Sequence, residues 1–511
     1  MDRKSLSNAT ESFTLVFISI LLLPLSLTLS SLALLTQQWP SQLRRFQQQK
    51  QQRLGQQRRR TVLVTGVGMA KGLTLARAFY LNGHRVIGAD FETRGIPCSG
   101  RLSKSLSAFR AMENPGPKNA TRSYVSQLFN IVQEEGVDLW VSCSGVASAL
   151  EDAKAKELVE RETSCKCIQL GVNETATLHE KDSFMREAEN LGLPVPITHD
   201  VVSPDDALRI LLESQAAHRE RKFILKTVDV DDANRGNMTL LPLGSKNATK
   251  DHVSRLSITP EHPWILQEFI PGGEEYCTHA LIVRGQIKGF VACPSAELLM
   301  HYRALPRTSS LSRAMLAFTR EYVFRSPNPE LFTGHLSFDF MVKDIAVDEK
   351  SIERSIYAIE CNPRAHTAVA LFAQDGPEMT AMIQAYLSTL DETPDSYAGV
   401  LKQNGLREDS IVYPTRTALP RYWIGHDLFS LVLYPVLQWI LGQGTLRQLS
   451  GSCIEFLDHV LNWKEGTFEV WDPLPALVLY HVYWPLTILS AWWNGFRWSR
   501  VNVSTTKMFG C

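Results

Sequence analysis

The chain has 511 residues, enough for about three domains, which excludes a small disulfide-stapled scaffold. Lysine plus arginine total 53 and aspartate plus glutamate total 53, so no net charge favours binding to nucleic acid. The 44% hydrophobic share is that of a folded protein and excludes bulk disorder. The nine scattered cysteines, an odd number, indicate a reducing compartment rather than a disulfide framework.

The N-terminal 60 residues have the pattern of a membrane anchor. After a short tail, residues 1–12, residues 13–35 carry no charge and form a helix long enough for the roughly 30 Å of bilayer hydrocarbon. A cleaved signal peptide is the alternative, but the apolar stretch exceeds its usual core of about 7–15 residues. The linker 36–60 is rich in glutamine and basic residues and has no acid, which predicts that the following chain faces the cytosol. We expect an endomembrane location, such as the endoplasmic reticulum.

Residues 61–90, TVLVTGVGMAKGLTLARAFYLNGHRVIGAD, predict a strand, a glycine turn, an amphipathic helix and a second strand. Asp90 ends the second strand, where it can meet a ribose, and the turn can admit a phosphate at the helix N-terminus. The equally simple alternative is that the glycines only permit a tight turn. A helix over 124–135 and a strand over 138–143 continue a parallel sheet. The glycines of the turn are Gly66, Gly68 and Gly72.

Two lysines follow in the next part of the chain. Lys181 precedes an amphipathic helix, and Lys226 lies on the short strand KFILKTV. Two lysines separated by a folded subdomain can converge on a triphosphate, whose charge requires cations. Each lysine taken alone is read more simply as a surface residue.

The segment ILQEFIPGGEEY has the pattern of a hinge. Glu268 ends an apolar strand, Phe269 and Ile270 continue the backbone, and Glu275 follows a Pro-Gly-Gly turn. Such a hinge can pair an adenine edge with main-chain groups and a ribose with a carboxylate. The alternative is a solvated acidic turn.

Hard oxygen ligands follow on two further strands. GHLSFDFMV places Asp339 between two phenylalanines, and IYAIECNPRAHTA places Glu360, Asn362 and Arg364 near the end of a partner strand. A carboxylate flanked by apolar positions is costly to bury unless it is paired or binds a cation. The three oxygen-bearing side chains suit Mg²⁺ or Mn²⁺, and a structural salt bridge to Arg364 is the alternative.

In this order, the motifs of about residues 61–390 resemble the ATP-grasp superfamily, including its carbamoyl-phosphate-synthase-like, D-alanine–D-alanine-ligase-like and biotin-carboxylase-like members. The resemblance implies an α/β fold with a Rossmann-like pre-ATP-grasp domain, residues 61–175, and a two-subdomain α+β ATP-grasp domain, residues 176–390. It implies ATP and Mg²⁺ or Mn²⁺ as cofactors.

The resemblance also implies roles for single residues. Arg364 and Lys226 are implied to act in catalysis, and Lys226 also to bind nucleotide. The implied nucleotide-binding positions are Lys181, Lys226, Glu268, Phe269, Ile270 and Glu275. The implied metal ligands are Asp339, Glu360 and Asn362.

Two departures from the family pattern are visible. The segment 229–237, expected to form a lid over the phosphates, contains one glycine where the family is usually rich in glycine and serine. Ser337 stands where dipeptide-forming relatives have an arginine for the substrate carboxylate, which disfavours a D-alanine-type substrate. Arg303 and His366 are candidate substrate-pocket residues, each also readable as surface or structural.

The C-terminal part, residues 391–511, is rich in tryptophan, tyrosine and leucine. Pro435, Pro475 and Pro485 argue against a second clean span, and favour helices that lie in the membrane interface or cover an apolar groove over a re-entrant hairpin. The stretch EVWDPLPALVLYHVYWPL resembles, more loosely, the tail of ATP-grasp ligases related to the mycosporine-glycine-forming enzymes.

The function we expect is an ATP-dependent carbon–nitrogen ligase of small-molecule, secondary metabolism, acting on a carboxylic acid or enol and an amine such as an amino acid. A catalytically degenerate nucleotide-binding membrane scaffold is the first alternative. A membrane-tethered dinucleotide reductase is the second, weakened because no tyrosine has a lysine four residues later. The sequence leaves the oligomeric state open.

Overall fold

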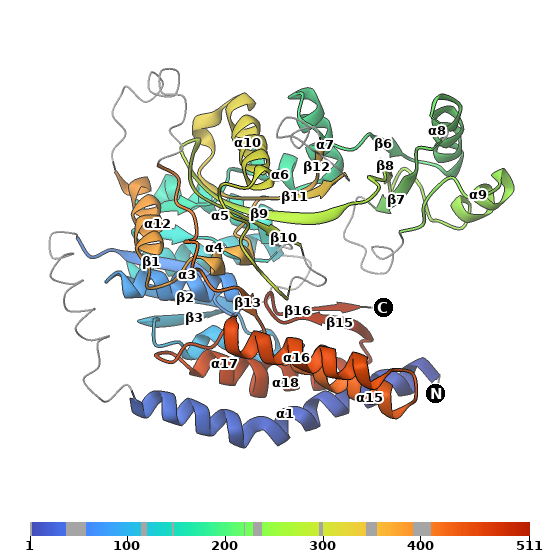
Figure 1. Cartoon of the computed structure of the whole chain (residues 1–511). Coiled ribbons are helices and arrows are strands. Elements are labelled where there is room, and N and C mark those ends of the chain that lie inside the picture. Colours follow the sequence, from blue (N-terminus) through green and yellow to red (C-terminus); the bar gives the residue numbers. More distant parts are fainter. Residues whose placement is uncertain are drawn as a thin grey trace.

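The computed structural model describes residues 3–36, 58–113, 120–145, 148–218, 220–227, 238–295, 300–343, 355–391 and 410–510. Two main sheets with covering helices stand above a layer of apolar helices that contains both the N-terminal helix and the C-terminal region (Figure 1). The predicted α/β fold class is confirmed by this arrangement of a parallel sheet and a mixed helix-and-strand body.

The first sheet has five parallel strands in the order β3-β2-β1-β4-β5, as expected for a Rossmann-like unit. Its strands are buried and rich in β-branched residues, so both faces need helices to cover them. The strands are β1 (Thr61–Thr65), β2 (Arg85–Phe91), β3 (Ala108–Met112), β4 (Leu139–Val141) and β5 (Lys166–Ile168), and the helices α3 (Ala70–Leu81), α4 (Ala120–Glu135) and α5 (Ala149–Glu162), with short 3₁₀ turns η1 (Thr93–Gly95) and η2 (Ser99–Leu102).

The glycine turn after β1 is packed against the chain's own backbone. Gly66 has φ +71°, and a Cβ on Gly72 would stand 2.2 Å from the carbonyl oxygen of Gly66. Gly68 N–H donates to Asp90 Oδ2 at 2.7 Å, so the carboxylate expected for a ribose bonds to the turn itself. The geometry therefore supports the simpler interpretation, in which the glycines permit a tight strand-to-helix turn.

A four-stranded antiparallel sheet, β10-β9-β11-β12, and a three-stranded sheet, β6-β8-β7, form the next two lobes. Phe338 and Phe340 of β11 point into a core with Phe318 and Tyr322 of α10. The larger lobe contains β9 (Glu274–Val283), β10 (Gln286–Pro294), β11 (Gly334–Val342), β12 (Ile356–Asn362), α6 (Val172–His179), α7 (Lys181–Asn190), α10 (Ser310–Arg325), η5 (Pro329–Leu331), η6 (Thr367–Leu371), α12 (Pro377–Leu387) and η7 (Ser388–Leu390). The smaller lobe contains β6 (Thr198–Val201), α8 (Pro204–Ala217), β7 (Phe223–Thr227), α9 (Lys246–Val253) and β8 (Trp264–Glu268).

The C-terminal prolines, which we expected to argue against a second clean span, lie within continuous helical stretches, and one of these, Leu474–Trp493, is long enough to cross a membrane. Pro485 follows the π-helical segment η10 (Leu479–Tyr483) and Pro435 follows the π-helical segment η9 (Leu428–Leu433). A wider π turn tolerates the missing backbone N–H of a proline. Pro475 lies in the first turn of its helix, where a backbone N–H has no intrahelical acceptor. The other elements are β13 (Arg421–Tyr422), α14 (Ile424–Asp427), α15 (Tyr434–Ile440), α16 (Leu446–Asn462), β14 (Lys464–Glu465), α17 (Leu474–Val478), α18 (Trp484–Trp493), β15 (Trp498–Asn502) and β16 (Lys507–Gly510).

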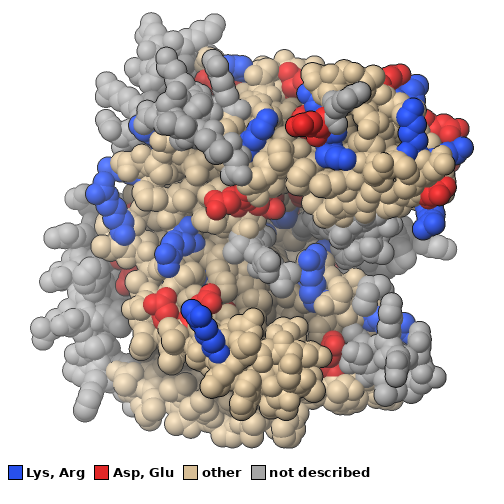
Figure 2. Space-filling view, turned by 45° about the vertical axis from the view of Figure 1, so that its right-hand side comes forward, with Lys and Arg blue, Asp and Glu red and all other residues tan. Residues whose placement is uncertain are grey.

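Helix α1 (Arg3–Thr36) lies along this C-terminal layer (Figure 1). Two helical stretches of the described chain, Ala9–Thr36 and Leu474–Trp493, are long and apolar enough to cross a membrane. A signal sequence or a buried core helix can share this composition, so the two helices by themselves do not establish an anchor. Charged side chains are sparse along the lower edge of the molecule (Figure 2), the edge at which α1 and the C-terminal helices lie in Figure 1.

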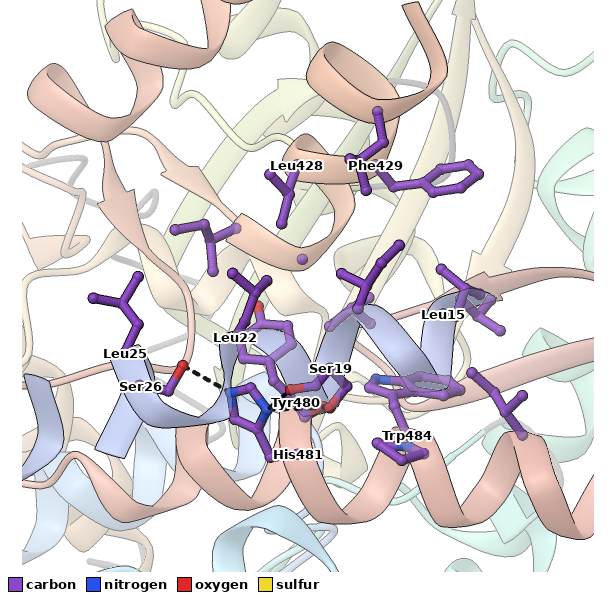
Figure 3. A pocket seen from close by; sticks show the side chains of 18 of the residues that line it. Leu15, Ser19, Leu22, Leu25, Ser26, Leu428, Phe429, Tyr480, His481 and Trp484 are labelled. Carbon is purple, nitrogen blue, oxygen red and sulfur yellow. Dashed lines mark hydrogen bonds between the residues drawn. The ribbon is translucent and has the colours of Figure 1, made fainter. Parts of the chain in front are cut away.

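A cavity of about 350 Å³ lies between α1 and the C-terminal helices, and its walls are largely leucine, isoleucine and aromatic side chains (Figure 3). Its polar groups pair with one another: His481 Nε2 lies 2.7 Å from Ser26 Oγ, and His481 Nδ1 lies 2.9 Å from the carbonyl oxygen of Ser19. These contacts attach the N-terminal helix to a segment more than 450 residues later in the chain.

A buried ion pair ties the Rossmann-like sheet to the C-terminal region. Arg77 of α3 and Asp472 are each 1% exposed, and Arg77 Nε lies 2.8 Å from Asp472 Oδ2. Arg77 also donates to the carbonyl oxygens of Thr467 and Asp472, while Ser103 Oγ donates to the carboxylate. The pair is fully hydrogen-bonded, which is the condition under which a buried ion pair is tolerated.

Candidate active site

A cavity of about 250 Å³ lies between the three-stranded and the four-stranded sheets. Eight of the ten predicted site residues line it, contributed by α7, β7, the end of β8, β9, β11 and β12. The remaining two, Asn362 and Arg364, adjoin it through hydrogen bonds to one another and to Asp339. The eight are Lys181, Lys226, Glu268, Phe269, Ile270, Glu275, Asp339 and Glu360.

The two lysines reach this cavity from different elements. Lys181 is the first residue of α7, and its Nζ lies 4.0 Å from Glu360 Oε2. Lys226 lies near the end of β7, and its Nζ donates to Gln267 Oε1 at 2.7 Å. Both side chains are partly buried, so each ammonium group faces the cavity rather than bulk solvent. Two lysines that line one cavity suit a ligand that carries several negative charges.

The hinge after β8 has its main-chain donors partly in use. Phe269 N–H donates to the carbonyl oxygen of Lys222 at 2.8 Å, and Glu268 N–H donates to the carbonyl oxygen of Ile197 at 2.8 Å. In the described part of the chain no hydrogen bond uses the N–H of Ile270, which lines the cavity. The Glu268 carboxylate pairs with Arg221 at 3.1 Å, which fixes the end of the strand.

The candidate metal ligands lie on neighbouring strands. Asp339 of β11 is directly opposite Glu360 of β12, and the register shifts immediately after this pair. Carboxylates placed opposite each other repel unless a cation lies between or near them. Asn362 Nδ2 donates to Asp339 Oδ2 at 3.1 Å, and Arg364 Nη1 donates to Asn362 Oδ1 at 2.5 Å. Hard oxygen atoms of this kind are the donors that suit Mg²⁺.

Glu275 also lines this cavity. Ser295 Oγ donates to Glu275 Oε1 at 2.9 Å. Burial, and the nearby Glu360 carboxylate, raise the pKa of Glu275, while the hydrogen bond from Ser295 and the charge of Lys226 oppose the rise.

Gln267 is a site residue that the sequence reading missed. It is 2% exposed and holds Lys226, although it lies inside the apolar strand WILQE. A polar side chain within a buried strand is the signal that points to it, because such a group needs a partner. Met238, Met341 and Ile359 supply apolar walls suited to a flat base.

Lys71 was also missed, although it lies within the glycine-turn segment. Its side chain is buried, and its Nζ donates to the carbonyl oxygens of Ser144 at 2.8 Å and Ala365 at 2.9 Å. Burial, and then the nearby Arg364 guanidinium, lower the pKa of Lys71 to about 7. Lys71 thus joins the Rossmann-like sheet to the backbone that carries Arg364.

The other sequence candidates lie elsewhere. Arg303 is exposed and its guanidinium lies 5.1 Å from the centre of the Trp463 ring, outside the cavity. His366 Nδ1 accepts from Ala368 N–H at 3.2 Å, which caps a 3₁₀ turn. Ser337 is buried and pairs in register with Asn362. The segment 229–237, predicted as a lid, lies outside the described residues.

Comparison with solved structures gives several ligases and carboxylases of similar fold. A carboxyaminoimidazole ribonucleotide synthase from Aspergillus clavatus in complex with ATP is 12% identical with a TM-score of 0.45, over 71% of this chain and 80% of that chain. An N5-carboxyaminoimidazole ribonucleotide synthetase in complex with ADP is 15% identical with a TM-score of 0.44, over 63% and 76% of the two chains. An L-amino acid ligase from Bacillus licheniformis is 11% identical with a TM-score of 0.40, over 60% and 68%.

These likenesses are distant, and no residue of this chain takes its role from them. A scan against protein-family models finds no match, and a search of curated proteins finds none. The interpretation of the cavity depends on its own residues.

Proposed function

We propose that the chain is an ATP-dependent ligase that activates a carboxylate or an enol by phosphorylation and joins it to an amine, in small-molecule metabolism. One observation carries the proposal. Two lysines, a hinge and paired carboxylates from separate segments line a single cavity of about 250 Å³ in the order that the ATP-grasp resemblance implies. A cavity of that size, with an apolar wall and a charged end, suits an adenine base followed by phosphates.

The residues divide the binding between them. The Ile270 amide and the methionine walls would hold the base, and Glu275 a ribose hydroxyl. Lys181 and Lys226 would neutralise phosphate oxygens, since each is already directed into the cavity by a partner on its wall. Asp339, Glu360 and Asn362 would hold Mg²⁺ through oxygen atoms.

The chemistry follows from the poor electrophilicity of a carboxylate in water. Bound ATP with its metal ion supplies a phosphoryl group that turns the carboxylate or enol oxygen into a good leaving group. Arg364 adjoins the metal ligands through Asn362, and from there its guanidinium would stabilise an oxyanion at the reacting centre. Lys226 would keep the transferring phosphate aligned.

One observation favours a second candidate, a nucleotide-binding scaffold without turnover. Arg364 is hydrogen-bonded to Asn362 Oδ1, the oxygen that the metal would use. In a scaffold this contact would persist when nucleotide binds. A ligase requires Asn362 Oδ1 to bind the ion as well.

The apolar layer formed by α1 and the C-terminal helices would hold the enzyme at a membrane with its cavity on the cytosolic side. Exposed leucines cover α1, and Trp439, Ile440 and Leu461 are exposed on the C-terminal helices. The basic linker 36–60, most of which lies outside the described residues, supports a cytosolic orientation.

The test uses the full chain in detergent, supplied with ATP, Mg²⁺ and a panel of carboxylic acids or enols with amino acids. A ligase releases ADP and phosphate only when both an acceptor acid and an amine are present. A scaffold binds Mg–ATP saturably but releases no product with any pair. Absence of saturable nucleotide binding would contradict both candidates.

A further inference from the structure

A second cluster of metal-ligating side chains lies between the larger lobe and the C-terminal helices. His301 follows β10, Asp427 ends α14, and His459 belongs to α16. His301 Nε2 lies 2.7 Å from Asp427 Oδ1, and His459 Nδ1 lies 2.6 Å from Asp427 Oδ2. The three ligand atoms all lie within 4.8 Å of one another. Nitrogen and oxygen donors from three segments therefore meet at one point. Two of these segments, those of His301 and Asp427, are more than a hundred residues apart in the chain.

Asp427 is buried between the two histidines. Its side chain is 0% exposed, and among the described residues no lysine or arginine forms an ion pair with it. A buried carboxylate is costly unless a positive charge lies against it. The two imidazole nitrogens contact both of its oxygens, and a metal ion shared by the three side chains would supply the positive charge.

The surroundings of the cluster are aromatic. The His459 ring lies 4.2 Å from the Trp463 ring and 4.7 Å from the His301 ring, measured between centroids. His459 is 5% exposed, whereas His301 is 23% exposed. One side of the cluster is thus dry and the other opens to solvent at His301, which leaves room for a water molecule as a further ligand.

We propose that His301, Asp427 and His459 bind a divalent transition metal ion, and that Zn²⁺ is the preferred ion. A donor set of two imidazoles and a carboxylate binds Zn²⁺ in preference to Mg²⁺. Zinc–ligand bonds are about 2.0–2.2 Å long, so ligand atoms on one ion stand up to roughly 4.2 Å apart, and small side-chain rotations bring the cluster into that range. The solvent-facing side of His301 accommodates the remaining ligand, a water.

The position of the cluster gives the ion a structural role. His301 precedes Tyr302, whose backbone bonds to Arg421 and whose ring lies 5.8 Å from that of His366, two residues after Arg364. A metal ion here would pin α14 and α16 to the lobe that carries the candidate active site. This site is distinct from the oxygen-rich cavity, both in its ligands and in the elements that build it.

The test is metal uptake by the untagged full chain in detergent. After removal of all metal, the protein is titrated with Co²⁺ in the presence of excess Mg²⁺, which occupies the oxygen-ligand site. We expect one equivalent of Co²⁺ to bind with the visible absorption of a low-symmetry nitrogen- and oxygen-ligated ion, and Zn²⁺ to displace it. Absence of saturable Co²⁺ and Zn²⁺ uptake by the unaltered protein would overturn the proposal, independently of any variant.

Variants identify the ligands. His301→Gln changes the most exposed ligand, and we expect it to lose stoichiometric uptake while the melting profile of the metal-free protein is unchanged. His262→Gln, which replaces an exposed histidine of the smaller lobe, should bind as the unaltered protein does. If metal uptake is unchanged in both His301→Gln and Asp427→Asn, other residues bind the ion and the proposal is overturned.

Discussion

Replacing Lys226 by methionine gives the sharpest test of the nucleotide cavity. Lys226 Nζ donates to Gln267 Oε1, and both groups line the cavity. A hydrogen bond from an ammonium to a phosphate contributes about 1.5–3 kcal/mol, so Lys226→Met should weaken Mg–ADP binding by roughly 10- to 150-fold. Titration calorimetry on the detergent-solubilised chain measures this change directly.

Lys222 supplies the matched control. It lies on the same segment four residues earlier, and its Nζ donates to the carbonyl oxygen of Pro242 at 2.6 Å, outside the cavity. Each methionine variant leaves one acceptor without its lysine, which costs stability by about 1–3 kcal/mol. Only Lys226→Met should lose affinity. Equal Mg–ADP affinity in the two variants, within about twofold, would refute the assignment of Lys226 to the phosphates.

Three further predictions concern the rest of the fold. Arg77→Met leaves Asp472 buried without its cation, and should lower the free energy of unfolding by about 3–5 kcal/mol in denaturant titrations. A loss below about 1 kcal/mol would show that the ion pair does not stabilise the contact with the C-terminal region. Burial lowers the pKa of Lys71 to about 7, so unfolding takes up a proton between about pH 7 and 10.5. The free energy of unfolding should therefore rise with pH across this window, by about 5 kcal/mol in total. Lys71→Met should lose this rise, and parallel pH profiles of the two proteins would contradict the prediction. Deleting residues 1–36 removes the apolar helix α1, the longer of the two candidate spans, and fractionation should move the protein out of the membrane pellet. A variant that still pellets as a folded protein would shift the anchoring to the C-terminal helices.

Much of the fold could be predicted because its signals are local. Residues 61–90 form the expected strand, turn, helix and strand, since β-branched runs and glycine spacing act over a few residues. The grouping of Lys181, Lys226 and Glu360 in one cavity was predicted from the order of the motifs, and their roles stay predictions.

Other features depend on contacts between distant segments, which no local pattern records. The link of Lys71 to the backbone of Ala365 joins two lobes, and the cluster around Asp427 is assembled by packing of α14 and α16 on the segment after β10. The helical conformation around the C-terminal prolines could not be predicted for a different reason. A π turn before Pro485 removes the penalty that a regular helix would suffer, and this adjustment depends on packing rather than on sequence alone.

The proposed function requires that the cavity lined by Asp339 and Glu360 turns over ATP. The most direct measurement is ADP formation by Glu360→Gln, compared with the unaltered chain and with Glu274→Gln, a control on the exposed start of β9. We expect the unaltered chain and the control to form ADP in the presence of both an acid or enol and an amine, and Glu360→Gln to be slower by at least about 100-fold. An undiminished rate of ADP formation in Glu360→Gln would contradict the account.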